Sequence, residues 1–188
     1  MTDDRKRCRW CLGDDAYVAY HDEEWGVPIS ETQPLFQLLT LEGMQAGLSW
    51  LTVLRKRAAM EEAFHGFDLE RLAASGESDI KGWLLNTGVI RHRGKLAAMI
   101  NNARCVIAME DFVDFIWQFQ PVEKAHFDQM ASVPTQTPQS AAMSKALKQA
   151  GFKFVGPTTC YAFMQSAGLV NDHLKDCWRF QVCESMTP

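Results

Sequence analysis

The spacing of apolar residues is the feature that most constrains the fold of this chain. Apolar residues recur at intervals of three and four, most clearly in residues 93–109 and 112–119. This spacing places them on one face of an α-helix. No stretch of useful length alternates apolar and polar residues, as a half-buried β-strand would. The sequence therefore predicts an all-α domain built from short helices.

Start and stop residues predict where further helices lie. Pro34 is favoured in a first turn, Ser49 can cap a helix, and Gly151 stands where a helix commonly ends. Residues 121–138 contain three prolines and lack helical spacing, so they are predicted to form a long connection. The further helices expected are residues 35–41, a helix after Ser49, one starting at Ser78 and Asp79, residues 140–150, and one opened by Gly156 and Pro157 that ends at Gly168.

Length and segment composition define the class of protein. A chain of 188 residues predicts a single domain over residues 1–188, with a helical core at about 30–170. No apolar run approaches the roughly 18 residues of a membrane span. The segment 1–9 is charged and no apolar stretch follows it, so it does not resemble a secretory signal. We therefore expect a cytoplasmic protein with no membrane partner, in which the six cysteines are thiols or metal ligands.

Charge is spread unevenly along the chain. The formal net charge is -4, which argues against a nucleic-acid partner, since such domains are often strongly basic. However, residues 81–104 and 129–171 contain no acidic residue and together carry +8, which leaves -12 for the remainder. These two segments are compatible with one basic face that binds a polyanion, or with ordinary solvated helix surfaces.

Cysteine and histidine residues occur near both ends of the chain. Spacing of four would place His173 and Cys177 on one helical face, and Cys8 and His21 stand near the N-terminus. Two Cys and two His form a typical tetrahedral zinc set, which here would tie the N-terminal segment to the last helix. A buried Cys and a capping His unrelated to any metal fit the same residues. Two further cysteines are rival ligands, Cys11 and Cys183.

Residues 147–158 predict a hairpin between two helices. One helix ends at Gly151, and the next begins after Gly156 with free backbone N–H groups and a positive dipole end. Such an arrangement can bind a phosphate, and Lys153 and Thr158 add a charge and a hydroxyl donor nearby. The alternative is an ordinary hairpin of two helices with a glycine cap.

The first fifty residues combine many aromatic side chains with one carboxylate in an apolar setting. Glu42 follows Leu41 in a predicted helix, where its burial is costly without partners. Aromatic walls with a few polar groups can hold a flipped nucleic-acid base, and a cationic base would gain further from a carboxylate. The alternatives are core packing for the rings and a surface or capping role for Glu42. The aromatic residues are Trp10, Tyr17, Tyr20, Trp25, Phe36 and Trp50.

Several long motifs in order resemble those of one family. They are YHDEEWGVP at 20–28, LEGMQAGLSW at 41–50, GVIRHRGK at 88–95, GFKFVG at 151–156 and GLVNDH at 168–173. Together they resemble the 3-methyladenine DNA glycosylase I family of the helix-hairpin-helix superfamily, from about Cys8 to Cys177. The resemblance implies base-excision repair of alkylated double-stranded DNA. The family flips out 3-methyladenine and hydrolyses its N-glycosidic bond, leaving an abasic site, and we expect no lyase activity and a monomer.

The family's functional residues map onto this sequence by motif. The resemblance implies a catalytic role for Glu42, which would accept hydrogen bonds at the N6 and N7 edge of the base. It implies a structural zinc ion in terminal segments at about 8–25 and 170–183, and it disfavours Cys11 and Cys183 as ligands. The implied ligands are Cys8, His21, His173 and Cys177; the implied base-binding residues are Tyr20, Trp50, Trp10 and Trp25; the implied DNA-binding residues are Gly47, Leu48, Gly151, Lys153, Val155, Gly156 and Thr158.

One departure from the wider superfamily keeps other functions open. Many relatives place a catalytic Asp two residues before the histidine of this motif, where this chain has Asn171, as its own family does. Asp172 stands one residue later, beside an implied zinc ligand, and we assign it no catalytic role. The alternatives are a non-catalytic protein that binds damaged DNA and a zinc hydrolase of small substrates.

Overall fold

Every regular element of the protein is a helix within residues 4–187, the part described by this computed structural model. The prediction of an all-α fold is therefore confirmed for these residues. No helix among them combines the length and apolar character needed to cross a bilayer. The helices are α1 Asp15–Glu23, α2 Thr32–Gln45, α3 Trp50–Ala63, α4 Leu69–Ala74, α5 Glu77–Leu85, α6 Arg93–Ile107, α7 Phe112–Trp117, α8 Pro138–Gln149, α9 Pro157–Ser166 and α10 Trp178–Glu184, with 3-10 turns η1 Arg9–Cys11, η2 His65–Phe67 and η3 Met130–Ser132.

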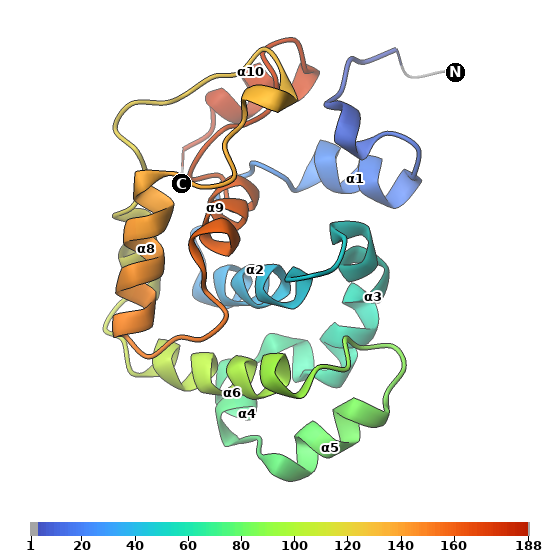
Figure 1. Ribbon diagram of the computed structural model, residues 1–188, viewed down its shortest axis with the longest axis vertical. Coiled ribbons are helices and arrows are strands. Elements are labelled where there is room, and N and C mark those ends of the chain that lie inside the picture. Colours follow the sequence, from blue (N-terminus) through green and yellow to red (C-terminus); the bar gives the residue numbers. More distant parts are fainter. Residues whose placement is uncertain (1–3, 188) are drawn as a thin grey trace.

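Helix α2 lies at the centre of the molecule. Figure 1 shows it crossing the middle, with α1 and α9 on one side and α6 on the other. Its apolar side chains are buried, because helices pack against it on several sides. Burying a large apolar side chain stabilises the fold by roughly 1.5–3 kcal/mol. The polar residues of α2 that are buried with these apolar side chains are Thr40 and Glu42.

Capping residues place several helices where the sequence predicts them. The hydroxyl of Ser49 accepts from Thr52 N at 3.2 Å and starts α3, and Pro157 opens α9 as expected. Helix α5 begins at Glu77, slightly before the predicted start. The reason is that Asp79 accepts from the backbone N–H of Gly76 at 2.8 Å, which makes it a third-position cap.

Three short helices were not predicted from the sequence. Helices α1 and α4 follow Asp14 and Asp68, whose carboxylates accept backbone N–H groups of the first turn. These Asp caps were available signals. Helix α10 has no side-chain cap, and its first backbone N–H donates to Lys6 O at 2.9 Å. That bond joins α10 to the N-terminal segment, and the two lie at the same end of Figure 1.

The acid-free segment 81–104 contributes fewer cations to the surface than its sequence suggests. Lys95 is buried and donates to Met44 O at 2.9 Å and Ala46 O at 2.6 Å, at the C-terminal end of α2. Arg104 donates to the carbonyls of Ala73 and Ser75 at the C-terminal end of α4, and Arg93 pairs with a glutamate. Burial therefore removes Lys95 from any basic face, whereas Arg93 and Arg104 are exposed side chains that already have partners.

Candidate functional site

An aromatic pocket of about 200 Å³ opens between α1, α2 and α9. All five side chains that the sequence analysis assigned to base binding and catalysis line it. The lining, called the aromatic pocket below, comprises Trp10, Tyr17, Tyr20, Trp25, Glu42, Gln45, Trp50, Met130, Ala162, Gln165 and Ser166.

The rings form two walls at different angles. Tyr20 and Trp50 have centroids 5.3 Å apart with planes tilted by 49°. Trp10 meets Trp25 edge to face at 5.0 Å, and also meets Tyr17 edge to face at 5.1 Å. Edge-to-face rings hold one another in fixed orientation. The pocket is therefore a preformed slot whose walls suit a flat ligand.

Glu42 projects from the central helix α2 into this slot and is only 4% exposed. Ser166 donates to Glu42 Oε1 at 2.7 Å, and Tyr20 donates in turn to Ser166 Oγ at 3.0 Å. Burial raises the pKa of Glu42 to about 8, although the bond from Ser166 opposes this shift. At neutral pH the unliganded pocket thus favours the protonated carboxyl, and a cationic ligand would favour the carboxylate.

Two polar atoms of the pocket have no hydrogen-bond partner in the described structure. They are Glu42 Oε2, an acceptor when the group is ionised, and Trp50 Nε1, a donor. Buried polar atoms are nearly always paired, so such exceptions need an explanation. A ligand that carries both a hydrogen-bond donor and a hydrogen-bond acceptor on its edge could pair with these two atoms.

Some lining residues were not assigned to the site from the sequence. Tyr17 precedes Tyr20 by one helical turn, a signal that was available. Ser166 and Gln165 lie at the end of α9, more than a hundred positions from Glu42, and no local pattern links them. Met130 reaches the pocket from η3, inside the connection predicted to be irregular.

Asn171, at the superfamily's catalytic position, and its neighbour Asp172 both lie outside the aromatic pocket. Asp172 is buried, and its Oδ2 accepts from Tyr161 at 2.6 Å and from Gln165 at 2.7 Å. Asn171 donates to Phe180 O at 3.0 Å, which attaches this segment to α10. Neither residue lines the aromatic pocket, which agrees with assigning Asp172 no catalytic role.

Cys8, His21, His173 and Cys177 converge in a second buried site, called the Cys/His cluster below. One ligand atom from each lies within 4.8 Å of the others. Cys177 Sγ is 3.4 Å from His21 Nε2 and 3.6 Å from His173 Nδ1, and Cys8 Sγ is 4.0 Å from His173 Nδ1. Ligands on a tetrahedral zinc ion lie about 3.3–3.8 Å apart, given zinc–ligand bonds of roughly 2.0–2.3 Å. The donor set and its spacing fit zinc.

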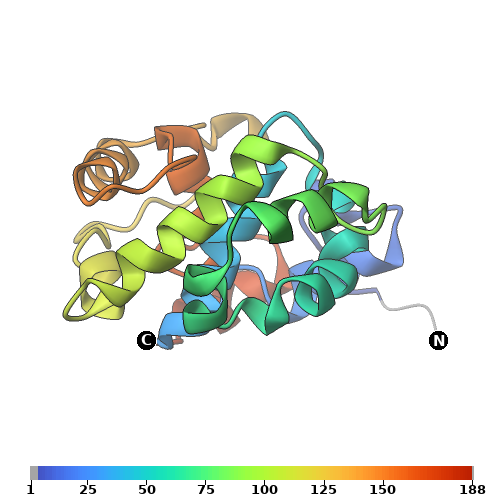
Figure 2. The ribbon, with the colours of Figure 1, turned by 90° about the horizontal axis from the view of Figure 1, so that it is seen from below.

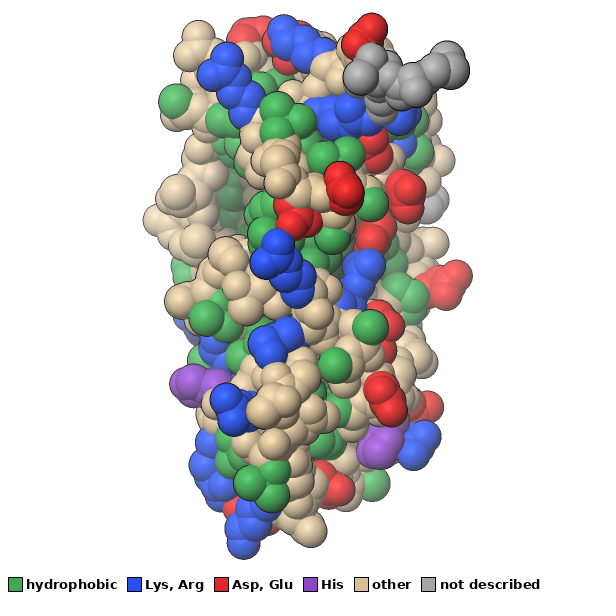
Figure 3. Space-filling view, turned by 90° about the vertical axis from the view of Figure 1, so that its right-hand side faces the viewer, with side chains coloured by type: hydrophobic (Ala, Val, Ile, Leu, Met, Phe, Trp, Pro, Cys, Tyr) green, Lys and Arg blue, Asp and Glu red, His purple; other side chains and the backbone are tan. Residues whose placement is uncertain are grey.

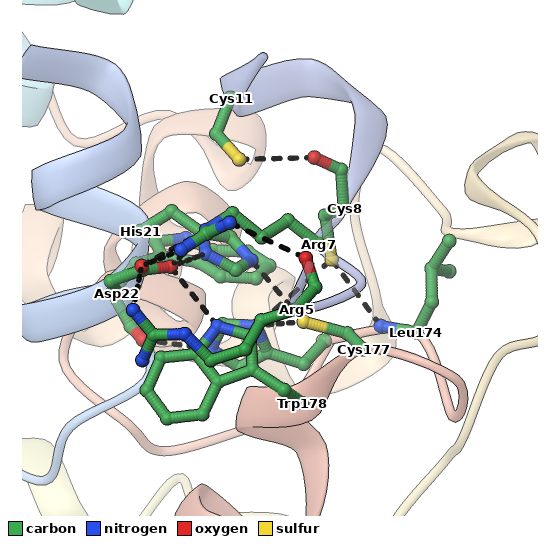
Figure 4. A network of polar contacts seen from close by, with 11 residues as sticks. Arg5, Arg7, Cys8, Cys11, His21, Asp22, Leu174, Cys177 and Trp178 are labelled. Atoms are coloured by element: carbon green, nitrogen blue, oxygen red, sulfur yellow. Dashed lines mark hydrogen bonds and ion pairs between the residues drawn. The ribbon is translucent and has the colours of Figure 1, made fainter. Parts of the chain in front are cut away.

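Neighbouring groups orient both imidazole rings of the cluster. His21 Nδ1 lies 2.8 Å from Asp22 Oδ1, and His173 Nε2 lies 2.9 Å from Trp25 O, so both of these nitrogens donate. The opposite nitrogen of each ring then faces the sulfur atoms as a lone-pair donor, as in many metal sites. Arg7 and Trp178 donate to Asp22 and hold its carboxylate in place (Figure 4).

The sulfur atoms differ in acidity and in position. The hydrogen bond between Cys8 and Cys177 lowers the pKa of Cys177 and, together with burial, raises that of Cys8. Cys11 lies outside the cluster and donates to Cys8 O at 3.0 Å (Figure 4), and Cys183 is also outside it. Of the six cysteines, only two share the site.

The helical argument for His173 and Cys177 is wrong. Both residues lie in the turn that precedes α10, and Cys177 is the N-terminal cap residue of that helix. They converge because the turn folds back, with Cys177 N donating to Leu174 O at 2.8 Å. A spacing of four can therefore bring two ligands together without a helix.

The structure contains the hairpin predicted at 147–158, in which residues 150–156 join the packed helices α8 and α9. Gly151 has a φ of +91°, a left-handed conformation that glycine adopts without strain. Asn102 of α6 accepts from Lys153 N and donates to Lys153 O, each at 2.9 Å. The Lys153 side chain is exposed, whereas the Val155 side chain is buried and its carbonyl accepts from Ser144. Val155 could thus offer a ligand only its backbone.

The start of α9 retains free backbone donors. Cys160 N donates to Gly156 O at 2.8 Å, which closes the first helical turn and leaves the earlier N–H groups outside the helix pattern. Thr158 lies in that first turn with an exposed side chain. Gly156 and Thr158 are therefore placed as a phosphate-binding helix start requires.

Gly47 and Leu48 form the tip of the 46–49 loop between α2 and α3. Gly47 has a φ of +80°, and Leu48 is 43% exposed although it is apolar. The bond from buried Lys95 to Ala46 O anchors the loop at its base. The loop thus presents an apolar side chain to solvent from an anchored position at the end of α2.

Comparisons with known proteins identify the family of this chain. Residues 10–180 match the family model described as methyladenine glycosylase. DNA-3-methyladenine glycosylase 1 of Escherichia coli (strain K12) is 50% identical over 179 residues, which cover 92% of this chain and 95% of that protein.

Two solved structures share the fold. A crystal structure of 3-methyladenine DNA glycosylase I has a TM-score of 0.89 and 51% identity, covering 92% of this chain and 98% of that one. A Tyr-to-Phe variant of 3-methyladenine DNA glycosylase I, solved in complex with 3-methyladenine, has a TM-score of 0.87 and 37% identity, covering 93% and 97%. The resemblance seen in the motifs is thereby confirmed, and the chain belongs to the methyladenine glycosylase family.

Proposed function

We propose that this protein is a DNA-3-methyladenine glycosylase of base-excision repair, which removes 3-methyladenine from alkylated DNA. The observation that carries the proposal is buried Glu42, whose Oε2 has no partner inside an aromatic slot. The substrate base is flat, carries a positive charge when methylated at N3 in DNA, and has an exocyclic amino donor. An aromatic slot with one buried carboxylate matches all three properties.

The chemistry needed from the protein is modest. The methylated base is already a good leaving group, so the pocket must stabilise the transition state rather than protonate the base. Tyr20 and Trp50 stack on the flipped base, with Trp10 and Trp25 enclosing it. Glu42, as the carboxylate, accepts from the amino group and stabilises the positive charge that passes from the base to the sugar in the transition state.

The reaction cleaves one bond and forms another. The bond between C1′ and N9 breaks, and its electron pair neutralises the cationic base, which leaves as neutral 3-methyladenine. Water adds to C1′ and loses a proton to solvent, which leaves an abasic site. No lysine is among the pocket-lining residues described above, so we expect no amine-dependent strand cleavage.

The Cys/His cluster would hold zinc through Cys8, His21, His173 and Cys177. Four protein ligands leave no open coordination position, so zinc would supply a structural cross-link between the terminal segments. Oriented imidazoles and buried sulfur atoms support this assignment. Elemental analysis of the purified protein tests it, with one zinc per chain expected.

The DNA partner would be a double-stranded duplex bound by a monomer of this protein in the cytoplasm. The hairpin would hold the backbone through Gly151, Lys153, Gly156, Thr158 and the backbone of Val155. Leu48, supported by Gly47, would enter the gap that the flipped nucleotide leaves. Its exposure on an anchored loop supports this role.

A base-release assay tests the proposed function. Methylated duplex DNA is incubated with the protein, and the released bases are separated by chromatography. We expect free 3-methyladenine and strands that break only on later alkaline treatment. Binding to methylated DNA without any base release would instead indicate a non-catalytic damage-binding protein.

A further inference from the structure

A second open groove, of about 490 Å³, lies beside the 46–49 loop. It runs between that loop, α3 and the segment that precedes α6. Four of its lining residues are basic and none is acidic. The lining, called the basic groove below, comprises Ala46, Gly47, Leu48, Thr52, Lys56, Val89, Ile90, Arg91, His92 and Lys95.

Arg91 differs from the other cations of its segment. Arg93 pairs with Glu77, and Lys95 is buried against backbone carbonyls. Arg91 is exposed in the groove, and among the described residues it has no ion pair or hydrogen bond. Lys56 faces the same groove and uses one N–H to bind Thr87 O at 2.6 Å, which leaves its other N–H groups available.

The basic groove adjoins the hairpin that is expected to bind DNA. His92 lines the groove and also meets Phe154 of the hairpin, with ring centroids 5.9 Å apart. Figure 2 shows the hairpin, the first turn of α6 and the 46–49 loop along one edge of the molecule. In the lower half of Figure 3, Lys and Arg gather toward the left and Asp and Glu toward the right.

We infer that the basic groove is a second phosphate-binding surface for duplex DNA, with Arg91 as its main contact and Lys56 beside it. The inference rests on the proposed function, because Leu48 at the groove's edge is the residue expected to enter the duplex. An arginine without a carboxylate partner, in a groove whose lining includes no acidic residue, suits a phosphate. The groove and the hairpin would then hold the backbone at two places around the lesion.

Salt dependence of binding tests this inference. The Kd of the full-length protein is measured for a short duplex that carries a tetrahydrofuran abasic-site analogue, between about 50 and 200 mM salt. Each lost phosphate contact reduces the slope of log K against log salt by about 0.9. Arg91→Ala is expected to reduce the slope by about that amount, with a several-fold weaker affinity at low salt. Arg91→Lys, which keeps the charge, is expected to retain the slope.

Arg93→Ala is the matched control. It removes the same charge from the same motif, but its guanidinium is already paired with Glu77, so its slope should stay close to that of the parent protein. An unchanged slope for Arg91→Ala, or equal changes for both alanine variants, would overturn the inference. Thermal unfolding of each variant shows whether the fold is retained.

The outcome is separable from that of the proposed function. Base release by the parent protein is measured on methylated DNA in the same preparation. If no base is released, the glycosylase proposal fails. The salt slopes measured on the abasic duplex still show whether the basic groove binds phosphate. If base is released and Arg91→Ala keeps the slope of the parent protein, only the inference that the basic groove binds phosphate fails.

Discussion

The aromatic pocket and the Cys/His cluster lie against each other, yet they differ in whether their buried polar atoms have hydrogen-bond partners. Trp25 belongs to both, since its ring lines the pocket and its carbonyl accepts from His173. In the cluster, the outer nitrogens of both imidazoles have acceptors within the protein. In the pocket, Glu42 Oε2 and Trp50 Nε1 have none among the described residues.

This difference supports the proposed roles of the cluster as a structural site and of the pocket as a ligand site. A buried polar atom without a partner costs about 1–3 kcal/mol. The protein satisfies the cluster with its own groups, whose inner atoms are spaced for an ion. It leaves two polar atoms of the pocket without hydrogen-bond partners. A ligand that supplies these hydrogen bonds therefore binds more tightly than one that cannot.

The largest effect is expected when the cluster itself is broken. Cys177→Ser replaces one of the buried sulfur atoms that we propose as zinc ligands, and loss of a metal site commonly costs more than about 4 kcal/mol. For a chain of this size, that corresponds to a fall of at least about 8 °C in Tm. Calorimetry and zinc analysis measure both consequences.

Cys11→Ala is the control for that variant, because Cys11 is equally buried but lies outside the cluster. It should keep one zinc per chain and show a smaller fall in Tm. Full zinc content in Cys177→Ser would contradict the assigned ligand set.

The next largest effect is expected from removing the carboxylate of the pocket. Glu42→Gln preserves the shape of the side chain but removes the negative charge that stabilises the transition state. Removing one such electrostatic group commonly lowers the rate on the order of 10²-fold. Single-turnover release of 3-methyladenine should fall by about this factor, while affinity for an abasic duplex changes little. Equal release by parent and variant would remove Glu42 from the mechanism.

Titration of Glu42 also predicts a pH-dependent stability. Its pKa is about 8 in the folded protein against an ordinary value of 4.5. The folded state therefore holds a proton that the unfolded state has lost. This stabilisation is complete below pH 4.5 and is lost as the pH rises through 8.

The glutamine side chain of Glu42→Gln has no titratable proton, so this variant serves as the reference for the pH dependence of the parent protein's stability. Its stability relative to the parent protein should rise between about pH 5 and 9. Urea unfolding across that range measures the difference. A constant difference at all pH values would show that Glu42 is not held in its protonated form.

The smallest of these effects concerns the chain of hydroxyls behind Glu42. Tyr20→Phe removes the donor to Ser166 Oγ but keeps the ring that faces Trp50. A neutral hydrogen bond contributes about 1 kcal/mol, so base release should slow by roughly five-fold. Zinc content should be unchanged, because His21, not Tyr20, faces the cluster. An effect as large as that of Glu42→Gln would give Tyr20 a direct role in the chemistry.

Local patterns were sufficient for much of the fold and for the walls of the pocket. Helical spacing predicted α6 and α7, and Ser49 predicted the start of α3. The motifs indicated Tyr20, Glu42 and Trp50, which line one pocket. Each of these signals lies within a short stretch of chain.

What escaped prediction depends on contacts between distant segments. The partner of Glu42 is Ser166, 124 positions away, and neither residue's neighbours encode that bond. Lys95 was counted as a surface cation because nothing local shows that it would bind the end of α2. His173 and Cys177 converge in a turn that is stabilised by backbone bonds, not by helical periodicity.

Helix α1 serves both sites with consecutive residues. Tyr20 faces the aromatic pocket and His21 faces the Cys/His cluster, because neighbours on an α-helix point about 100° apart. Inserting or deleting one residue in α1 would rotate both side chains away from their sites at once. During evolution this segment can therefore change its exposed residues freely, but its length must be inherited intact.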